Sequence, residues 1–342
     1  MSTRSELGES PELLQRLLGT AAERVEVVAR AVREREVDVV VIAARGTSDH
    51  AALYGQYVLG ARNGLLVAPA SPSLFSVYGA PPRVRHALVI GISQSGRSPD
   101  VVAVLEDARR QGSTTVAITN DPDSELAAAA DHVIELMAGP ERAVAATKTY
   151  LAELAIIAML SSALSGDDGS AAELRAIPAA LRRVLAEEEA IVELAGRWAA
   201  EPACAVLARG FHYATAREWA LKLKELAHLL ADPYSGADFQ HGPITLVGAG
   251  FPVLAVVTSG PVRDGMAELL GRLRDRGARL LVASDDPELL ALGDPIRLPP
   301  APEWLSPLVA ILPAQLFAYH LALARGLDTE APRNLSKVTL TL

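Results

Sequence analysis

Two loops of the chain carry side chains that could bind a phosphate group. One loop is Arg45-Gly46-Thr47-Ser48 and the other is Ser93-Gln94-Ser95-Gly96-Arg97-Ser98, and each directly follows an apolar run. Hydroxyl and amide groups, with backbone N–H groups at the start of a helix, suit a phosphate dianion. The alternative is that these serines only cap helices. The sequence has no GxGxxG after the first apolar run and no GxxxxGK[ST], so it indicates neither a dinucleotide site nor a P-loop.

A second group of candidate residues is ionisable. In the segment EWALKLKE, Glu218, Lys222 and Glu225 are four and three positions apart, which places them on one face of a helix. The same spacing is typical of an ion-pair ladder on a helix surface. His241 stands directly before Gly-Pro, which favours a turn rather than a helix interior. Lys337, close to the end of the sequence, would by itself be expected in solvent.

The elements that position these residues repeat along the chain. Three pairs of glycines are separated by 164, 164 and 165 positions: Gly46 and Gly210, Gly96 and Gly260, and Gly112 and Gly277. Each pair follows or precedes similar apolar runs, so the two halves are expected to share one fold. The second half offers Thr258-Ser259-Gly260-Pro261 where the first has its serine-rich loop. This loss of hydroxyls predicts one phosphate site per chain, in the first half.

Each half alternates continuous Val/Ile/Leu runs with helical segments. Such runs are typical of parallel strands buried on both faces, so we predict an α/β protein with two tandem, doubly wound, mostly parallel sheets flanked by helices. The predicted organisation begins with a helical segment over 1–34, in which 11–34 form one amphipathic helix. A first domain over 35–165, a helical linker over 166–198 broken by Pro178, a second domain over 199–330 and a tail over 331–342 follow.

The composition excludes several classes of protein. A net charge of −9 argues against general nucleic-acid binding, and a single cysteine, Cys204, excludes a disulfide framework or a multi-cysteine zinc site. No cluster with metal-ligand spacing is evident, and we expect neither a metal nor a cofactor. The polar start of the sequence does not resemble a signal peptide, and the apolar stretches 151–164 and 304–324 are expected to be buried helices rather than membrane spans. We therefore expect a cytoplasmic protein.

The motifs together resemble the sugar isomerase (SIS) domain family. Gly-Thr-Ser at 46–48, Ser-Gln-Ser-Gly-x-Ser at 93–98, ExALKLKE at 218–225, His-Gly-Pro at 241–243 and PRNLSK at 332–337 follow one another as in the isomerase half of glucosamine-6-phosphate synthases. The likeness runs from about residue 35 to the C-terminus. It implies that Ser93, Gln94, Ser95 and Ser98 bind a sugar phosphate, and that Thr47 and Ser48 lie along the sugar. The loop that contains Ala146 would line the same sugar, and Lys222 would contact the substrate.

The resemblance also implies the catalytic roles. His241 would assist opening of the sugar ring, Glu225 would carry a proton between carbons 1 and 2, and Lys337 would form an imine with a ketose carbonyl. In the family the histidine loop reaches the partner's site, so a homodimer is expected, and the sequence leaves open whether His241 acts in trans.

The expected reaction depends on the source of ammonia. The synthases carry a glutaminase domain with an N-terminal cysteine nucleophile, whereas this sequence begins MSTRSELGES and has its one cysteine at 204. We therefore expect a deaminating isomerase that converts glucosamine 6-phosphate and water to fructose 6-phosphate and ammonia. Ala146, Gln240 and Arg97 stand where the synthases have Ser, Lys and often Glu. The charge of Arg97 is compatible with a phosphate, whereas Ala146 lacks a hydroxyl near the sugar, which leaves the identity of the sugar open.

Three alternatives remain. The protein could be another phosphosugar aldose–ketose isomerase, or a deglycase that acts on a sugar–amine conjugate. It could also be a non-catalytic sugar-phosphate sensor, although a sensor has no need of Glu225, His241 and Lys337 together.

Overall fold

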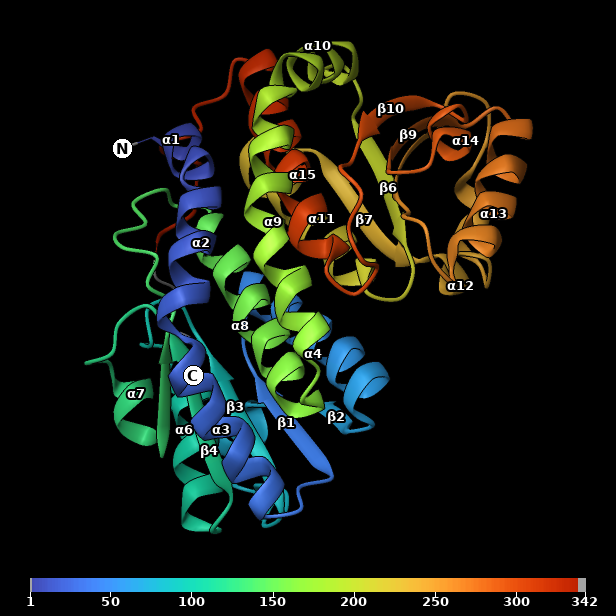
Figure 1. The fold of residues 1–342 in the computed structure, drawn as a ribbon. Helices are drawn as coiled ribbons and strands as arrows, with labels where there is room; N and C mark the ends of the chain where they lie inside the picture. Colours follow the sequence, from blue (N-terminus) through green and yellow to red (C-terminus); the bar gives the residue numbers. More distant parts are fainter. Residues whose placement is uncertain (1, 338–342) are drawn as a thin grey trace. The chain divides into compact units, whose positions relative to one another are not determined.

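The computed structural model describes residues 2–337, which contain two parallel sheets, each in a compact unit of its own (Figure 1). The first-sheet unit consists of Glu12–Glu141, Lys148–Arg175 and the tail from Ser336. The second-sheet unit consists of the residues up to Pro11, together with Arg142–Thr147 and Ala176–Leu335.

The first sheet has five parallel strands in the order β2-β1-β3-β4-β5. Its strands are β1 (Val39–Ala43), β2 (Leu66–Pro69), β3 (Ala87–Ile92), β4 (Thr114–Thr119) and β5 (His132–Glu135). Every residue of β3 and β4 is buried, because helices cover both faces of the sheet. This is why ALVIGI and TTVAIT do not alternate apolar with charged residues: the residues on both faces of each strand are buried.

The helices of this unit form two layers. They are α3 (Ala22–Glu34), α4 (Thr47–Asn63), α5 (Ser73–Ser76), α6 (Pro99–Arg110), α7 (Glu125–Ala129) and α8 (Lys148–Ser165), with most of α2 (Ser10–Thr20) and the start of α9 (Asp168–Ala186). Helices α3 and α4 contact α8, whereas α5 and α7 contact α6. On the α6 side, Val89 and Ala117 of the sheet share a buried cluster with Leu105 and Leu126.

The second sheet repeats the first, with the order β10-β9-β8-β6-β7 and parallel pairing throughout. Its strands are β6 (Ala203–Ala208), β7 (Leu230–Ser235), β8 (Pro252–Val256), β9 (Arg279–Ser284) and β10 (Asp294–Arg297). Strand β7 contains Asp232 and Pro233, which its edge position permits, because an edge strand leaves one side unpaired. The two sheets confirm the predicted α/β class with tandem parallel sheets.

The helices of the second-sheet unit are α1 (Thr3–Gly8), α10 (Glu188–Trp198), α11 (His212–Ala227), α12 (Gly236–Phe239), the 3₁₀ helix η1 (Pro243–Leu246), α13 (Arg263–Asp275), α14 (Pro287–Leu290) and α15 (Ser306–Ala324). In this unit, α11 contacts β6, β7 and β8, whereas α13 and α14 contact β9. Helix α15 is long and apolar enough to span a membrane, but 78% of its most apolar window is buried inside the protein. Since it packs on α10 and α11, α15 has the features of a core helix, as the sequence predicted.

Two local expectations about helices are wrong. The leading helix is not continuous over 11–34 but ends at Thr20 and restarts at Ala22 as α3. Pro178 does not break the linker, because α9 runs through it to Ala186. A proline removes one backbone N–H donor and disturbs one turn, which a helix of 19 residues tolerates.

Candidate active site

The two polar loops of the first-sheet unit lie at the carboxyl ends of neighbouring strands. The Gly46–Ser48 loop follows β1 and leads into α4, while the Ser93–Ser98 loop follows β3 and leads into α6. Strands β1 and β3 are paired, so the starts of two long helices meet at one edge of the sheet. Ligands of open α/β sheets bind at this edge, where helix N-termini favour anions.

The second loop is organised by its own hydroxyls. Gly96 donates its backbone N–H to the carbonyl oxygen of Ser93 at 3.1 Å and to Ser93 Oγ at 3.2 Å. Ser98 is the N-cap of α6, yet its side chain makes no capping hydrogen bond and lies 3.4 Å from Ser93 Oγ. The capping interpretation therefore does not account for Ser98. Gln94 and Ser95 are half-buried beside them.

Gly96 is required by its surroundings. Its φ of +64° lies in the left-handed region, and a Cβ there would stand 2.0 Å from Ser124 Oγ. Only glycine fits such a close approach, which brings the loop backbone against the turn before α7.

The first loop is fixed by two polar contacts. Ser48 donates a hydrogen bond to Glu153 of α8 at 2.8 Å, and both side chains are buried. Arg45 forms an ion pair at 2.6 Å with Asp100, a fully buried carboxylate in the first turn of α6. Arg45 therefore connects the two loops, a role that the sequence analysis missed. Thr47 lies half-buried at the first position of α4.

The predicted ionisable face of α11 exists, and it is buried rather than exposed. Lys222 lies 3.4 Å from Glu218 and makes a short ion pair with Glu225. Glu218 and Lys222 are fully buried, while the side chain of Glu225 is 18% exposed. Burial by itself would lower the pKa of Lys222, but the two carboxylates outweigh this effect and raise the pKa. Lys222 is therefore an ammonium that holds Glu225 in place.

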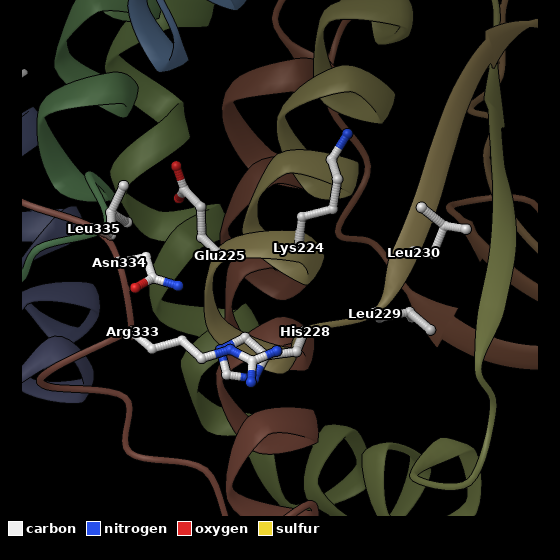
Figure 2. Close-up of a pocket in the computed structure, with 8 residues that line it drawn as sticks. All are labelled: Lys224, Glu225, His228, Leu229, Leu230, Arg333, Asn334 and Leu335. Atoms are coloured by element: carbon white, nitrogen blue, oxygen red, sulfur yellow. The ribbon is translucent and has the colours of Figure 1, made fainter.

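Glu225 faces an open pocket of about 430 Å³ within the second-sheet unit. Figure 2 shows the residues that line it, with the Arg333–Leu335 coil segment passing opposite the end of α11. The full lining is Lys224, Glu225, His228, Leu229, Leu230, Arg333, Asn334 and Leu335. The pocket thus combines one acidic side chain with two basic ones, Lys224 and Arg333.

His228 is a pocket residue for which no function was predicted from the sequence. It follows the last residue of α11 in the left-handed conformation, with φ +49° and ψ +33°. Its backbone N–H donates to Leu223 and closes the helix. A left-handed residue other than glycine is uncommon, and here it brings an imidazole to the wall of the Glu225 pocket.

His241 lies on a turn, as its Gly-Pro context predicted. It is exposed between α12 and η1 and is held by a backbone hydrogen bond to Asp238 at 3.0 Å. It does not line the Glu225 pocket. Gln240, the residue before it, accepts a hydrogen bond from Arg272 of α13.

Lys337 lies in the first-sheet unit. Its ammonium is 2.7 Å from Glu141, whose side chain is fully buried. Glu141 also accepts hydrogen bonds from the Thr149 backbone N–H at 3.1 Å and from Thr149 Oγ1 at 2.9 Å. Ala146 is half-buried and lies just before α8. Its segment, Arg142–Thr147, belongs to the second-sheet unit.

In the second repeat, side chains of the protein fill the positions that correspond to the two polar loops of the first. His212, which corresponds to Ser48, is buried, and its Nε2 lies 3.0 Å from Thr258 Oγ1 and 2.7 Å from Ser306 Oγ. Burial lowers the pKa of His212 to about 3, so it is neutral. The Glu303 side chain packs on Gly260, where a Cβ would be 2.5 Å from its carboxyl carbon. These contacts favour a single phosphate site, in the first repeat.

Two further expectations concern absent chemistry. Cys204 is buried in β6, and burial raises the pKa of its thiol to about 12, which suits a structural role. Among residues 2–337, no group of three or more His, Cys, Asp or Glu side chains could hold a metal ion.

Comparison with known proteins identifies the family. A model of the SIS domain matches residues 35–163 and 201–325. The chain belongs to the SIS domain family. Each copy of the SIS domain contains one of the two five-stranded sheets described above.

Several of the similar proteins carry the names of enzymes that act on sugar phosphates. A glutamine–fructose-6-phosphate aminotransferase (isomerizing) of Synechocystis is 36% identical over 86% of this chain and 50% of its own length, and the one of Methanothermobacter thermautotrophicus is 36% identical over 97% and 56%. The chain thus spans about half the length of these relatives. A "putative phosphosugar isomerase" from Silicibacter pomeroyi DSS-3 is 35% identical, with a TM-score of 0.88 over 96% of this chain and all of its own. A glucosamine-6-phosphate deaminase of Thermotoga maritima, 19% identical with a TM-score of 0.81, shares the fold.

The structure brings some of the predicted residues together. The hydroxyl loops are adjacent in the first-sheet unit, and Lys222 contacts Glu225 in the second-sheet unit. No ion pair of Arg45 or Glu141, and no pocket position for His228, was predicted from the sequence. Their signals are contacts across more than 50 positions or a single left-handed residue, which hydrophobic periodicity does not show.

Proposed function

We propose that this SIS protein is an amino-sugar phosphate isomerase that releases ammonia. The proposed reaction converts glucosamine 6-phosphate and water to fructose 6-phosphate and ammonia. Three relations support it: the two polar loops at the N-termini of α4 and α6, the 36% identity to aminotransferases named for fructose 6-phosphate, and the buried acid–base face of α11.

The observation that carries the proposal is the Glu218–Lys222–Glu225 arrangement. An ion-pair ladder on a surface would be solvated, whereas this one is buried and ends at a carboxylate that faces a pocket. A proton acceptor must be held within hydrogen-bond distance of its substrate, and Lys222 fixes Glu225 without covering it. Glu225 would move the proton between carbons 1 and 2.

Two other residues would complete the chemistry. His241, on its exposed turn, would transfer a proton at the ring oxygen during ring opening. Lys337 would form an imine with the ketose carbonyl at carbon 2. Ser93, Gln94, Ser95 and Ser98 would bind the phosphate, with Thr47, Ser48 and Ala146 along the sugar.

Mass action supports the proposed direction of the reaction. With water in large excess and ammonia at low concentration, the exchange of the amine for water favours deamination. The buried thiol of Cys204, with its raised pKa, does not suit a nucleophile that would release ammonia from glutamine.

The test is an ammonia assay with glucosamine 6-phosphate. We expect the purified chain to release ammonia and fructose 6-phosphate in equal amounts, and Glu225→Gln to lose at least about 100-fold of this rate, as expected for an acid–base residue. Glu268→Gln, the same substitution at an exposed glutamate of the same unit outside the pocket, is the matched control and should keep the wild-type rate. A wild-type protein that forms neither product contradicts the proposal.

A second candidate is a sugar–amine deglycase. Lys224 and Arg333 place two cations in the Glu225 pocket, which suits an amine that carries a carboxylate. Release of an amino acid, with no turnover of glucosamine 6-phosphate, would favour this candidate. Fructose 6-phosphate turnover without any amine would indicate a plain aldose–ketose isomerase.

A further inference from the structure

The sequence has few lysines. Of its 32 basic residues only four are lysines, at 148, 222, 224 and 337, and the other 28 are arginines. Lys148 and Lys222 are buried, Lys337 is 25% exposed, and Lys224 is exposed. An arginine at position 337 could make the same ion pair as Lys337 but could not form an imine. The partner of Lys337 therefore bears on the chemistry of this amine.

That partner, Glu141, is a carboxylate with no exposed surface. Its Oε2 accepts hydrogen bonds from Lys337 Nζ at 2.7 Å and from Thr149 Oγ1 at 2.9 Å, and its Oε1 accepts one from the Thr149 backbone N–H at 3.1 Å. Thr149 lies in the first turn of α8, where N–H groups lack partners within the helix. Glu141 is thus oriented from two sides, and a buried carboxylate so held is stabilised by a cation beside it.

We propose that Glu141 is the counter-ion of Lys337, both as the free ammonium and as the iminium formed with a ketose; this inference rests on the proposed function. Condensation of the ammonium with the carbonyl breaks two N–H bonds and the C=O bond, forms the C=N bond, and releases water. The nitrogen keeps one proton and the positive charge. Because the charge is conserved, Glu141 has a cationic partner before and after the step.

The same contact gives Glu141 a positioning role. The iminium withdraws electrons from carbon 1, so a carboxylate that stabilises the cation favours the species from which the carbon-1 proton is lost. Glu141 acts through Lys337 and is therefore a positioning residue. It lies 196 positions from Lys337 along the chain, and both belong to the first-sheet unit.

The first measurement needs no substrate. The amines are labelled with acetic anhydride, and each lysine is quantified by mass spectrometry with exposed Lys224 as the internal reference. In Glu141→Gln we expect Lys337 to be labelled at least about 5-fold faster relative to Lys224 than in the wild type, because the ammonium loses its charged partner. Glu125→Gln, at an exposed glutamate of the same unit, should change nothing. Equal labelling in wild type and Glu141→Gln overturns the ion pair.

The second measurement traps the imine. Fructose 6-phosphate and borohydride should convert the wild-type imine to a secondary amine on Lys337, with Lys337→Arg as the blank. We expect Glu141→Gln to trap at least about 10-fold more slowly, Glu141→Asp to recover part of the rate, and Glu125→Gln to match the wild type. Equal trapping in wild type and Glu141→Gln overturns the counter-ion role alone. No trapping in the wild type, with labelling as expected, overturns the imine chemistry of the proposed function while the ion pair stands.

Glu141→Gln also alters the hydrogen bonds that Glu141 accepts from Thr149 at the start of α8, and a separate variant controls for this effect. Thr149→Val removes the hydroxyl donor but keeps the carboxylate, so it should lower thermal stability without increasing the labelling of Lys337. If Thr149→Val exposes Lys337 as much as Glu141→Gln does, the effect of Glu141 comes from folding of α8, and the proposal is overturned.

Discussion

Lys222 shows how a single buried charge organises a site. It lies between Glu218 and Glu225 with no exposed surface, so each carboxylate depends on the same ammonium. A buried ion pair contributes little net stability compared with apolar packing, but removing one partner is costly. The arrangement is therefore better explained by the orientation of Glu225 than by stabilisation of α11.

Lys222→Met should destabilise the protein strongly. The substitution leaves two buried carboxylates without their cation, which costs about 3–5 kcal/mol when the partner of a buried pair is lost. Lys224→Met, two positions away and exposed, should change stability by less than about 0.5 kcal/mol. Urea unfolding of both variants tests this. A similar midpoint for the two would show that the carboxylates do not depend on Lys222.

His212 gives the protein an acid-sensitive core. Its folded pKa is about 3 against 6.5 in the unfolded chain, because burial disfavours the charged ring. Between these values only the unfolded state binds the proton, so stability is full above pH 6.5 and falls as the pH decreases, by about 1.4 kcal/mol per pH unit.

The prediction for His212 is a change in pH dependence. His212→Gln should flatten the decline in unfolding free energy between pH 6.5 and 5, whereas His86→Gln, at an exposed histidine, should retain the wild-type slope. Urea titrations at several pH values measure both slopes. Equal slopes in the wild type and His212→Gln would show that the ring is not kept neutral in the fold.

At the scale of elements, the strand-to-helix loops carry the difference between the two repeats. Both repeats end a buried strand with a turn and begin a helix, but the first presents Ser93 and Ser98 while the second packs Glu303 onto Gly260. The sequence predicted this asymmetry from the number of hydroxyls. It could not predict that a carboxylate fills the second loop, because Glu303 lies more than 40 positions away.

Gly96 offers a test of how tightly the first loop is built. Gly96 and Gly139 have nearly equal φ values, +64° and +62°, but only Gly96 has a neighbour where a Cβ would be. Gly139→Ala should cost about 1–2 kcal/mol for the left-handed conformation alone. Gly96→Ala should cost more and should abolish the thermal stabilisation of the protein by fructose 6-phosphate.

Urea unfolding and thermal shift of these two variants separate the effects. Equal stability losses would mean that the approach to Ser124 is not limiting. Normal sugar-phosphate stabilisation of Gly96→Ala would mean that the Ser93–Ser98 loop does not bind the phosphate.

At the scale of the whole molecule, the sequence predicted the architecture better than the contacts of the site. Glycines at nearly constant separation marked two copies of one fold, and continuous apolar runs marked buried parallel strands, since both signals are local and repeated. The ion pair of Glu141 with Lys337 and the pocket position of His228 depend on single long-range or backbone features. These features have no periodicity, so only the structure reveals them.

The position of His241 leads to a prediction about assembly. The imidazole is exposed and does not line the Glu225 pocket, although both belong to the second-sheet unit. If His241 serves the site of a second copy, as the resemblance to the synthases implies, then His241→Ala and Glu225→Ala are each inactive alone but complement one another.

Mixing the two variants, after dissociation and reassociation, measures this directly. In a two-fold symmetric dimer, half of the randomly formed pairs are mixed, and each mixed pair has one site with both residues intact. The mixture should therefore recover about a quarter of the wild-type ammonia release. Equal amounts of wild-type protein and the double variant, mixed in the same way, provide the reference for exchange. No recovery, despite exchange shown by that reference, would place His241 and Glu225 of one site on the same chain.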